Sequence, residues 1–286
     1  MTLPTVGGLL PRAADYLGTR GVRSPRLDAE HLLAHALGLT RLDLYLALDR
    51  PLEPLEVDAF RDLVRRRGRR EPLAYVLGSW GFRGLDLRTD ARALVPRPET
   101  EVLVERALAL VADRAAPAVV DVGTGTGAIA LSVAKERPDA QVTAIDVSAD
   151  ALALTAENAG RNGLRERLEL LAGNLLEPVA GRRFDLVVAN LPYVGHGEPV
   201  DPEVAEYEPA EAVYAGADGR ALLDRLAEQL PPCLRPGAGV ALEVGLGQAE
   251  WLAGRLGRAG LVEIAVAGDL AGVDRVVLAR APAASA

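Results

Sequence analysis

The stretch VVDVGTGTGAIA, residues 119–130, decides the fold of this chain. An apolar run leads into glycines at alternate positions, and a helical pattern follows in which Ile129, Val133 and Ala134 form the apolar stripe. Glycines at a strand-to-helix turn let the backbone bend sharply and approach a ligand without clashes from Cβ atoms. The stretch therefore predicts a strand, a ligand-binding loop and a helix of a doubly wound α/β sheet.

The loop spacing is G-x-G-x-G, which differs from the G-x-G-x-x-G of dinucleotide sites and from the lysine-ended phosphate loop. A second strand, residues 141–146, ends on Asp146, where a carboxylate is placed to bond both hydroxyls of a ribose. A glycine loop without phosphate-binding features, together with a ribose acid, predicts S-adenosylmethionine as the cofactor. The cofactor-binding candidates from these two segments are Gly123, Thr124, Gly125, Thr126, Gly127 and Asp146.

A second motif, Asn190-Leu191-Pro192-Tyr193, follows the apolar run FDLVVA of residues 184–189. The Asn190 side-chain oxygen and a backbone carbonyl at Leu191 or Pro192 can accept the two hydrogens of a planar –NH₂ group, and Tyr193 offers a flat wall beside it. Asn190, Pro192 and Tyr193 are the catalytic candidates, and all four residues are substrate-binding candidates. Asn190 is also a cofactor-binding candidate. The tetrapeptide alone is weak evidence for a substrate site, because any Asn-x-Pro turn after a buried strand has the same sequence pattern.

Helical and strand patterns alternate from Pro96 to the end of the chain, which predicts a mostly parallel sheet with helices on both faces. The glycine loop follows the first of these strands and the tetrapeptide follows the fourth. Strand order usually reverses between those two strands, and ligands bind outside their carboxyl ends. Both motifs should therefore face one cleft.

The part of the chain before Pro96 has a different organisation. Residues up to about 70 carry helical patterning interrupted by prolines, and residues 76–95 read as a β-hairpin around Gly81 and Gly84. We expect a helical substrate-recognition domain over residues 1–72, a hairpin linker over 73–95 and a catalytic domain over 96–286.

Composition narrows the classes of function. The sequence contains no stretch of about twenty uncharged apolar residues, so we expect no membrane span. Its single cysteine among 286 residues fits a reducing compartment. We expect a cytoplasmic protein, acting as a monomer. The formal net charge of −8 makes nucleic acid an unlikely general partner.

Two local features have competing interpretations. His31 and His35 stand one helical turn apart beside Glu30, but no third ligand is apparent, so we expect no metal site. The arginine-rich segment 61–70 is either a docking patch or, the interpretation we favour, a solvated helix face and linker.

Several stretches together resemble the release factor glutamine N5-methyltransferases. They are DVGTGTGAIAL at 121–131, NLPYV at 190–194, LDAEHLLAH at 27–35, EPLAYVLG at 71–78, LVPRPETE at 94–101 and DLAGVDRVV at 269–277. The resemblance implies a Rossmann-like α/β fold with seven strands, the last antiparallel, beside a small N-terminal helical bundle. It also implies that Arg97 and Glu99 lie in a segment that closes over the methionine end of S-adenosylmethionine, and that Asn174 and Leu175 lie beside the adenine.

The chain departs from the family at two positions. Leu191 stands where the family usually has proline, although a backbone carbonyl is still available there. Asn174 stands where the family tends to carry an acid, and its side-chain oxygen can still accept from the adenine amine.

The resemblance implies transfer of a methyl group from S-adenosylmethionine to the glutamine of the Gly-Gly-Gln loop in class I peptide-chain release factors. Asn-Leu-Pro-Tyr also occurs in adenine methyltransferases, so an N6-adenine methyltransferase acting on RNA or DNA is the alternative. A non-catalytic docking module is a third reading, disfavoured by the intact glycine loop and Asn190.

Overall fold

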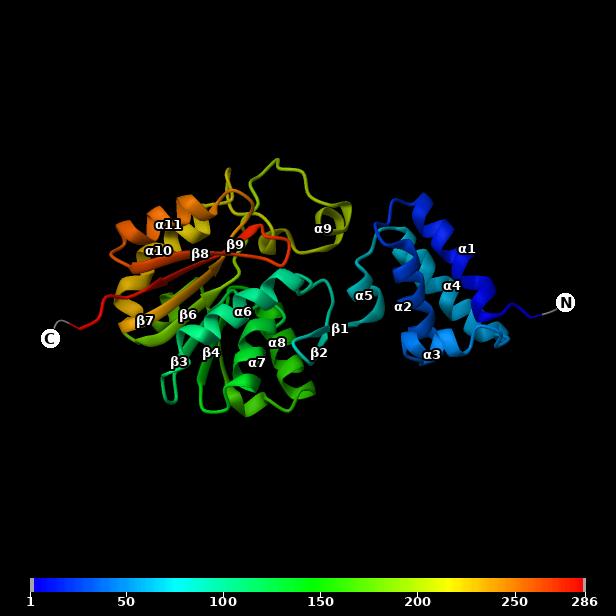
Figure 1. Ribbon diagram of the computed structural model, residues 1–286, viewed down its shortest axis with the longest axis horizontal. Coiled ribbons are helices and arrows are strands. Elements are labelled where there is room, and N and C mark those ends of the chain that lie inside the picture. Colours follow the sequence, from blue (N-terminus) through cyan, green and yellow to red (C-terminus); the bar gives the residue numbers. More distant parts are fainter. Residues whose placement is uncertain (1–2, 285–286) are drawn as a thin grey trace. The chain divides into compact units, whose positions relative to one another are not determined.

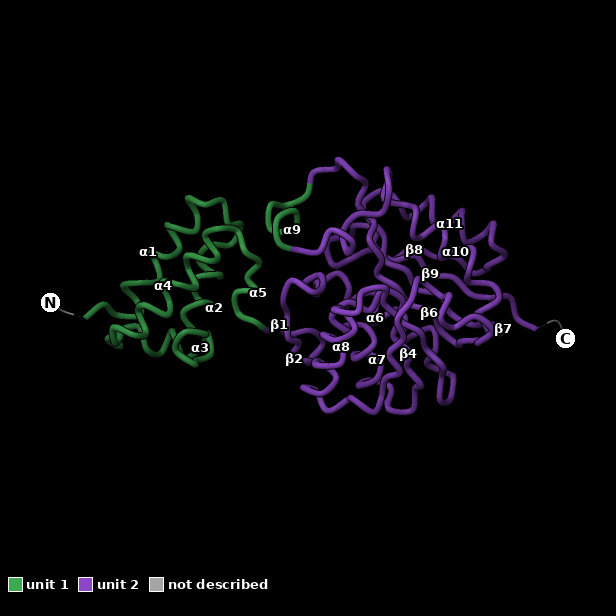
Figure 2. The backbone as a smooth tube through the Cα atoms, turned by 180° about the vertical axis from the view of Figure 1, so that it is seen from behind, with its two compact units in different colours: residues 1–78, 200–207 green, residues 79–199, 208–286 purple. Residues whose placement is uncertain are grey.

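The computed structural model describes residues 3–284 and divides the chain into two compact units (Figure 1). One unit holds the residues through Gly78 together with Val200–Tyr207, and the other holds Ser79–Pro199 and the residues from Glu208 onward (Figure 2). The helical bundle expected at the N-terminus is present, and the unit ends just before the hairpin. None of the helices within residues 3–284 has the length and apolar character needed to cross a membrane.

The N-terminal unit is all-helical. Its helices are α1 (Val6–Thr19), α2 (Pro25–Leu37), α3 (Arg41–Leu46), α4 (Pro54–Gly68), α5 (Leu73–Leu77) and the later α9 (Pro202–Tyr207). Proline occupies the first position of α2 and α4, where its fixed φ suits a helix and its missing N–H costs nothing. Gly38 ends α2 in the left-handed conformation that glycine adopts without strain. Residues of α1, α2 and α4, including Leu17, Leu32 and Leu33, form the buried core.

One arginine of the arginine-rich segment, Arg67, lies in this unit's interior, whereas Arg61, Arg65 and Arg69 are exposed. Arg67 is 4% exposed, and its guanidinium donates to Asp28 at 2.7 Å and to Glu203 of α9 at 2.8 Å. Arg70 pairs with the same Glu203 carboxylate at 2.9 Å, and the Tyr207 hydroxyl donates to the Arg69 carbonyl at 2.7 Å. The solvated-face interpretation is therefore wrong for Arg67, because these contacts fix α9 to the bundle.

The second unit begins with the predicted hairpin, β1 (Ser79–Phe82) and β2 (Leu85–Arg88), which pair antiparallel. Its remaining strands are β3 (Ala118–Val122), β4 (Gln141–Asp146), β5 (Leu168–Ala172), β6 (Phe184–Ala189), β7 (Leu234–Glu243), β8 (Val262–Gly268) and β9 (Asp274–Arg280). Its α-helices are α6 (Pro98–Leu110), α7 (Ala128–Glu136), α8 (Ala149–Arg161), α10 (Ala221–Cys233) and α11 (Ala249–Arg258), with short 3₁₀ turns at Arg165–Arg167, Glu177–Val179 and Ala210–Ala212.

Seven strands form one sheet in the order β5-β4-β3-β6-β7-β9-β8. Only β9 runs antiparallel to its neighbours β7 and β8, which confirms the expected seven strands with an antiparallel last strand. Helices α6, α7 and α8 cover one face and α10 and α11 cover the other (Figure 1), each over its own buried apolar layer. The order reverses between β3 and β6, so the ligand-binding crevice lies at their carboxyl ends.

The buried contacts of Arg67 predict a large stability difference between neighbouring arginines. Arg67→Met leaves the buried Asp28 carboxylate unpaired, so the free energy of unfolding should fall by about 3–5 kcal/mol in urea titrations. Arg65→Met is the matched control, because Arg65 and its partner Asp62 are both mostly exposed and such pairs contribute under about 1 kcal/mol. Equal losses in the two variants would contradict a buried anchoring role for Arg67.

Candidate active site

The two sequence motifs meet because β3 and β6 are parallel neighbours with Val122 opposite Ala189. Gly123 and Asn190 are the next residues on each strand, so the loop and the tetrapeptide leave the sheet side by side. A Cβ atom on Gly123 would lie 2.8 Å from Cδ2 of Leu191, and Gly123 has a φ of +76°. Only glycine fits this position, and Leu191 closes against it.

The glycine loop is fixed by backbone hydrogen bonds. The N–H groups of Gly123 and Thr124 both donate to the Ile145 carbonyl at the end of β4, at 2.8 and 3.0 Å. Gly127 donates to the Thr124 carbonyl at 2.8 Å and forms the N-terminal cap of α7 at a φ of +83°. The loop therefore makes one tight turn from β3 into α7, as the sequence predicts.

Asp146 sits at the carboxyl end of β4 and is held by the loop itself. Its Oδ2 accepts from the N–H of Gly125 and its Oδ1 from the N–H of Ser148, both at 2.9 Å. Burial raises the pKa of Asp146, and the backbone hydrogen bonds oppose that rise. Each oxygen keeps a further lone pair, so the carboxylate can still accept two hydroxyl hydrogens.

A pocket opens where these elements converge. Of the residues expected at the site, it is lined by Gly123, Gly125, Asp146, Asn174, Leu175, Asn190, Leu191 and Pro192. Four expected residues are not among those that line the pocket: Thr124, Thr126, Gly127 and Tyr193. Thr124 instead donates its hydroxyl to Asp121 at 2.7 Å, and the Tyr193 carbonyl accepts from Gln248 at 2.9 Å.

The pocket also contains residues that the motifs do not reveal. Arg92, Ala93 and Leu94 come from the segment after the hairpin, and Pro209, Glu211 and Ala212 come from the long segment after β6. Gly173 follows β5 and packs against Pro178. A Cβ atom on residue 173 would lie 2.1 Å from Cγ of the Pro178 ring. Asn174 donates to Glu177 at 3.3 Å, which orients its amide at the pocket rim.

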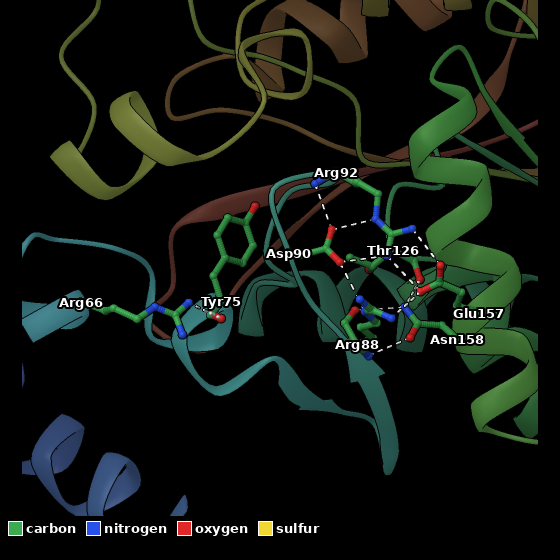
Figure 3. Close-up of polar contacts among 8 residues, drawn as sticks. All are labelled: Arg66, Tyr75, Arg88, Asp90, Arg92, Thr126, Glu157 and Asn158. Carbon is green, nitrogen blue, oxygen red and sulfur yellow. Dashed lines mark hydrogen bonds and ion pairs between the residues drawn. The ribbon is translucent and has the colours of Figure 1, made fainter. Parts of the chain in front are cut away.

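A polar network joins the glycine loop to the hairpin and α8 (Figure 3). Asn158 is fully buried: its Nδ2 donates to the carbonyls of Thr126 and Arg88, and its Oδ1 accepts from the Arg88 N–H at 2.7 Å. Arg92 bridges Asp90 and Glu157, with distances of 2.8 and 2.9 Å. These contacts fix the segment that carries Arg92 and Ala93 into the pocket. Arg66, also drawn in Figure 3, belongs to the N-terminal unit and donates to the Tyr75 carbonyl at 3.2 Å.

Two further groups of hydrogen bonds involve residues at or next to the pocket lining, Asn190 and Glu208. Arg97 donates to both carboxylate oxygens of the buried Glu208 at 2.7 Å, one residue before Pro209 of the lining. Asn190 donates through Nδ2 to the Thr100 hydroxyl at 3.1 Å, and Thr100 donates to the buried Glu243 at 2.8 Å. The sequence gives no local signal for Thr100 or Glu243, because each looks like an ordinary helix or strand residue.

Glu30, which stands beside the two histidines considered for a metal, is engaged in three hydrogen bonds. Glu30 accepts from Arg26, Arg41 and the Tyr45 hydroxyl. Within residues 3–284 no group of three His, Cys, Asp or Glu side chains is arranged to hold a metal ion.

The fold and the site define a Rossmann-like methyltransferase. Two family models match, the PrmC N-terminal domain over residues 9–78 and the methyltransferase small domain over residues 99–208. Among solved structures, a methyltransferase from Pyrococcus furiosus is 19% identical with a TM-score of 0.52, covering 70% of this chain and 90% of that one. The hMettl16 catalytic domain is 17% identical with a TM-score of 0.58, covering 77% and 82%. These likenesses show the fold.

Sequence relatives identify the family. The chain is 44% identical to the release factor glutamine methyltransferase of Geobacter sulfurreducens over 278 residues, covering 96% of this chain and 95% of the relative. It is 41% identical to the protein of the same name from Xylella fastidiosa, covering 96% and 99%. The chain belongs to the release factor glutamine methyltransferase family.

Asp121, at the base of the glycine loop, predicts how stability depends on pH. It is fully buried, and burial raises its pKa to about 7, against hydrogen bonds from Thr124 and Ala130 to its Oδ2. A carboxyl whose pKa is higher in the folded than in the unfolded protein contributes stability below its unfolded pKa of about 4, and loses that contribution as the pH rises through about 7.

Unfolding free energies measured at about pH 5 and about pH 8 should therefore show Asp121→Asn gaining stability relative to the unsubstituted protein at the higher pH. Asp139→Asn is the control, because the Arg137 guanidinium holds the pKa of Asp139 at about 2, below that window. A difference between Asp121→Asn and the unsubstituted protein that is the same at both pH values would show that Asp121 is ionised throughout.

Proposed function

We propose that this chain transfers a methyl group from S-adenosylmethionine to the side-chain amide nitrogen of the glutamine in the Gly-Gly-Gln motif of class I peptide-chain release factors. The observation that carries the proposal is the shared pocket of Asp146 and Asn190. Asp146 is the last residue of β4 and Asn190 follows β6, with β3 between these two strands. Together they offer a ribose acceptor and an amide acceptor. The family and the names of its members supply the class of substrate.

The pocket residues fit the cofactor. Asp146 would hold the ribose hydroxyls, while Asn174 and Leu175 would flank the adenine. Leu175 is buried at a φ of +53°, which turns the chain around the pocket edge. Gly123, Gly125 and Gly173 line the pocket without adding side chains to it. The cofactor supplies a methyl group activated by a positively charged sulfur.

The acceptor residues would orient a weak nucleophile. An amide nitrogen attacks poorly because its lone pair is delocalised into the carbonyl. Asn190 Oδ1 and the carbonyl of Leu191 or Pro192 would accept both N–H hydrogens and hold the nitrogen facing the donor side of the pocket. Orientation of this kind can lower a barrier by several kcal/mol, on the order of 7–11 in the best cases. Tyr193, which follows Pro192 and is half-buried, does not line the pocket.

The two units would have separate roles in the reaction. The N-terminal unit holds neither Asp146 nor Asn190, so we propose that it contacts the release factor away from the reacting glutamine. Release factors act where translation terminates, and we therefore propose that the enzyme works in the cytoplasm as a monomer.

N6-adenine methylation is the second candidate, because Asn-Leu-Pro-Tyr suits an exocyclic base amine as well as an amide. The net charge of −8 disfavours it, since nucleic-acid affinity rests on neutralising phosphates.

A direct assay separates these candidates. The protein is incubated with labelled S-adenosylmethionine and either a purified class I release factor, the same factor with its motif glutamine changed to Asn, or total RNA. Label on the first substrate alone supports the proposal, with the modified glutamine located by peptide mass spectrometry. Label on RNA and none on the release factor would replace it with the adenine activity.

The ribose role of Asp146 has a binding test. Asp146→Ala should weaken S-adenosylmethionine binding by about 1–3 kcal/mol, because charge-assisted hydrogen bonds to the ribose are lost. Asp150→Ala, an exposed acid in the first turn of α8, is the control and should leave the affinity unchanged. Isothermal titration calorimetry measures both. An unchanged affinity in Asp146→Ala would remove this residue from the ribose site.

Asn190 should separate chemistry from cofactor binding. Asn190→Ala removes an oriented acceptor, so kcat on the release factor should fall by about 100-fold or more while cofactor affinity stays nearly intact. Steady-state kinetics and calorimetry give the two values. A comparable loss of both would mean that Asn190 mainly holds the cofactor or the fold.

A further inference from the structure

Three side chains from separate elements form a chain of hydrogen bonds that ends at the acceptor pocket. Glu243 is the last residue of β7, Thr100 lies in the first turn of α6, and Asn190 follows β6. Thr100 donates from Oγ1 to Glu243 Oε2 at 2.8 Å, and Asn190 donates from Nδ2 to Thr100 Oγ1 at 3.1 Å. Thr100 is 4% exposed and Glu243 is 2% exposed, so water cannot easily substitute for either partner.

The direction of this chain is set by Glu243. An ionised carboxylate can only accept hydrogen bonds, so the single hydroxyl hydrogen of Thr100 must point toward it. The lone pairs of Thr100 Oγ1 then face Asn190, and only the –NH₂ end of the Asn190 amide can satisfy them. The amide is thereby fixed with Oδ1 away from Thr100. Asn190 lines the pocket, so Oδ1 is the atom left to accept from a substrate there.

We propose that Thr100 and Glu243 are positioning residues that hold the Asn190 amide in the orientation needed to accept from the substrate –NH₂ group. The inference rests on the proposed function, in which Asn190 Oδ1 accepts an N–H of the reacting glutamine. Neither residue lines the pocket: Thr100 acts through Asn190, and Glu243 acts on Asn190 both through Thr100 and through its own hydrogen bond with that amide.

The surroundings of Glu243 make this orientation sensitive to pH. Burial raises the pKa of Glu243 to about 7, with the Glu99 carboxylate adding to the rise, while Arg275 of β9 and the hydrogen bonds from Thr100 and Asn190 oppose it. Tyr193 also lies near this charge, and its own pKa is raised by burial and by Glu243.

Protonation of Glu243 would reverse the chain. The carboxylic acid donates to Thr100, Thr100 then donates to Asn190 Oδ1, and the amide turns its Nδ2 toward the pocket. Two –NH₂ groups then face each other and the acceptor is lost. Methyl transfer should therefore fall as the pH drops below about 7, while cofactor affinity at the separate ribose site stays constant.

Kinetics of matched variants test the positioning role. Thr100→Val keeps the shape without the hydroxyl and should lower kcat by about 10- to 100-fold with little change in cofactor affinity, whereas Thr100→Ser should retain most of the activity. The control is Thr143→Val, which breaks a hydroxyl–carboxylate pair of 3.0 Å to Glu169 away from the pocket and should keep the kcat of the unsubstituted protein. A fully active Thr100→Val variant, or an equally defective Thr100→Ser variant, would overturn the inference.

The pH profile tests Glu243 separately. Glu243→Gln should lose the decline of kcat on the acid side that the unsubstituted protein shows, and Glu250→Gln, an exposed acid of α11, should keep it. An unchanged acid limb in Glu243→Gln would show that another group titrates.

A spectroscopic measurement separates failure of this inference from failure of the proposed function. The ¹⁵N–¹H signals of the Asn190 side-chain amide, assigned by their loss in Asn190→Ala, should shift as the pH passes about 7 and should not shift in Glu243→Gln. No shift in the unsubstituted protein overturns the inference even if the enzyme is active. A clear shift together with no methylation of release factors supports it and overturns the assigned substrate.

Discussion

The parallel pairing of β3 with β6 is the constraint on which the site depends. It places Gly123 and Asn190 at the same edge of the sheet, so that one pocket receives both the loop and the tetrapeptide. A Cβ on residue 123 would lie 2.8 Å from Cδ2 of Leu191, and the φ of +76° there would strain any residue other than glycine. Glycine at position 123 therefore meets two needs: it adopts the positive φ of the turn, and it leaves space for Leu191, which follows the neighbouring strand.

The sequence predicted those features that depend on local chemistry. The seven strands, the hairpin and the alternation of helix and strand follow from apolar periodicity, and the structure confirms them. Asp146 could be chosen as the candidate ribose acid because the sequence predicts a strand over residues 141–146 that ends on this residue. Leu191, unusual for the family, lines the pocket as expected of the tetrapeptide.

The features that escaped prediction depend on partners far away in the chain. A run of arginines predicts a charged surface, yet Arg67 is buried because Asp28 and Glu203 approach it from helices that only the fold brings together. Asn158 looks like an ordinary polar residue of α8, and its role at the glycine loop appears only when its amide meets the carbonyls of Thr126 and Arg88. Thr100 and Glu243 likewise interact with partners that are distant in the chain, so their hydrogen bonds appear only in the fold.

Two buried carboxyl groups link the stability of the catalytic unit to its function. Asp121 and Glu243 both lie among apolar strands, where burial raises their pKa values to about 7 and makes the ionised forms costly. Apolar residues at both positions would suit the sheet better. Each carboxyl instead accepts from a threonine that serves the pocket: Thr124 in the glycine loop and Thr100 beside Asn190. The sheet gives up stability at both positions, and under the proposed function it gains a fixed geometry for the glycine loop and for the Asn190 amide.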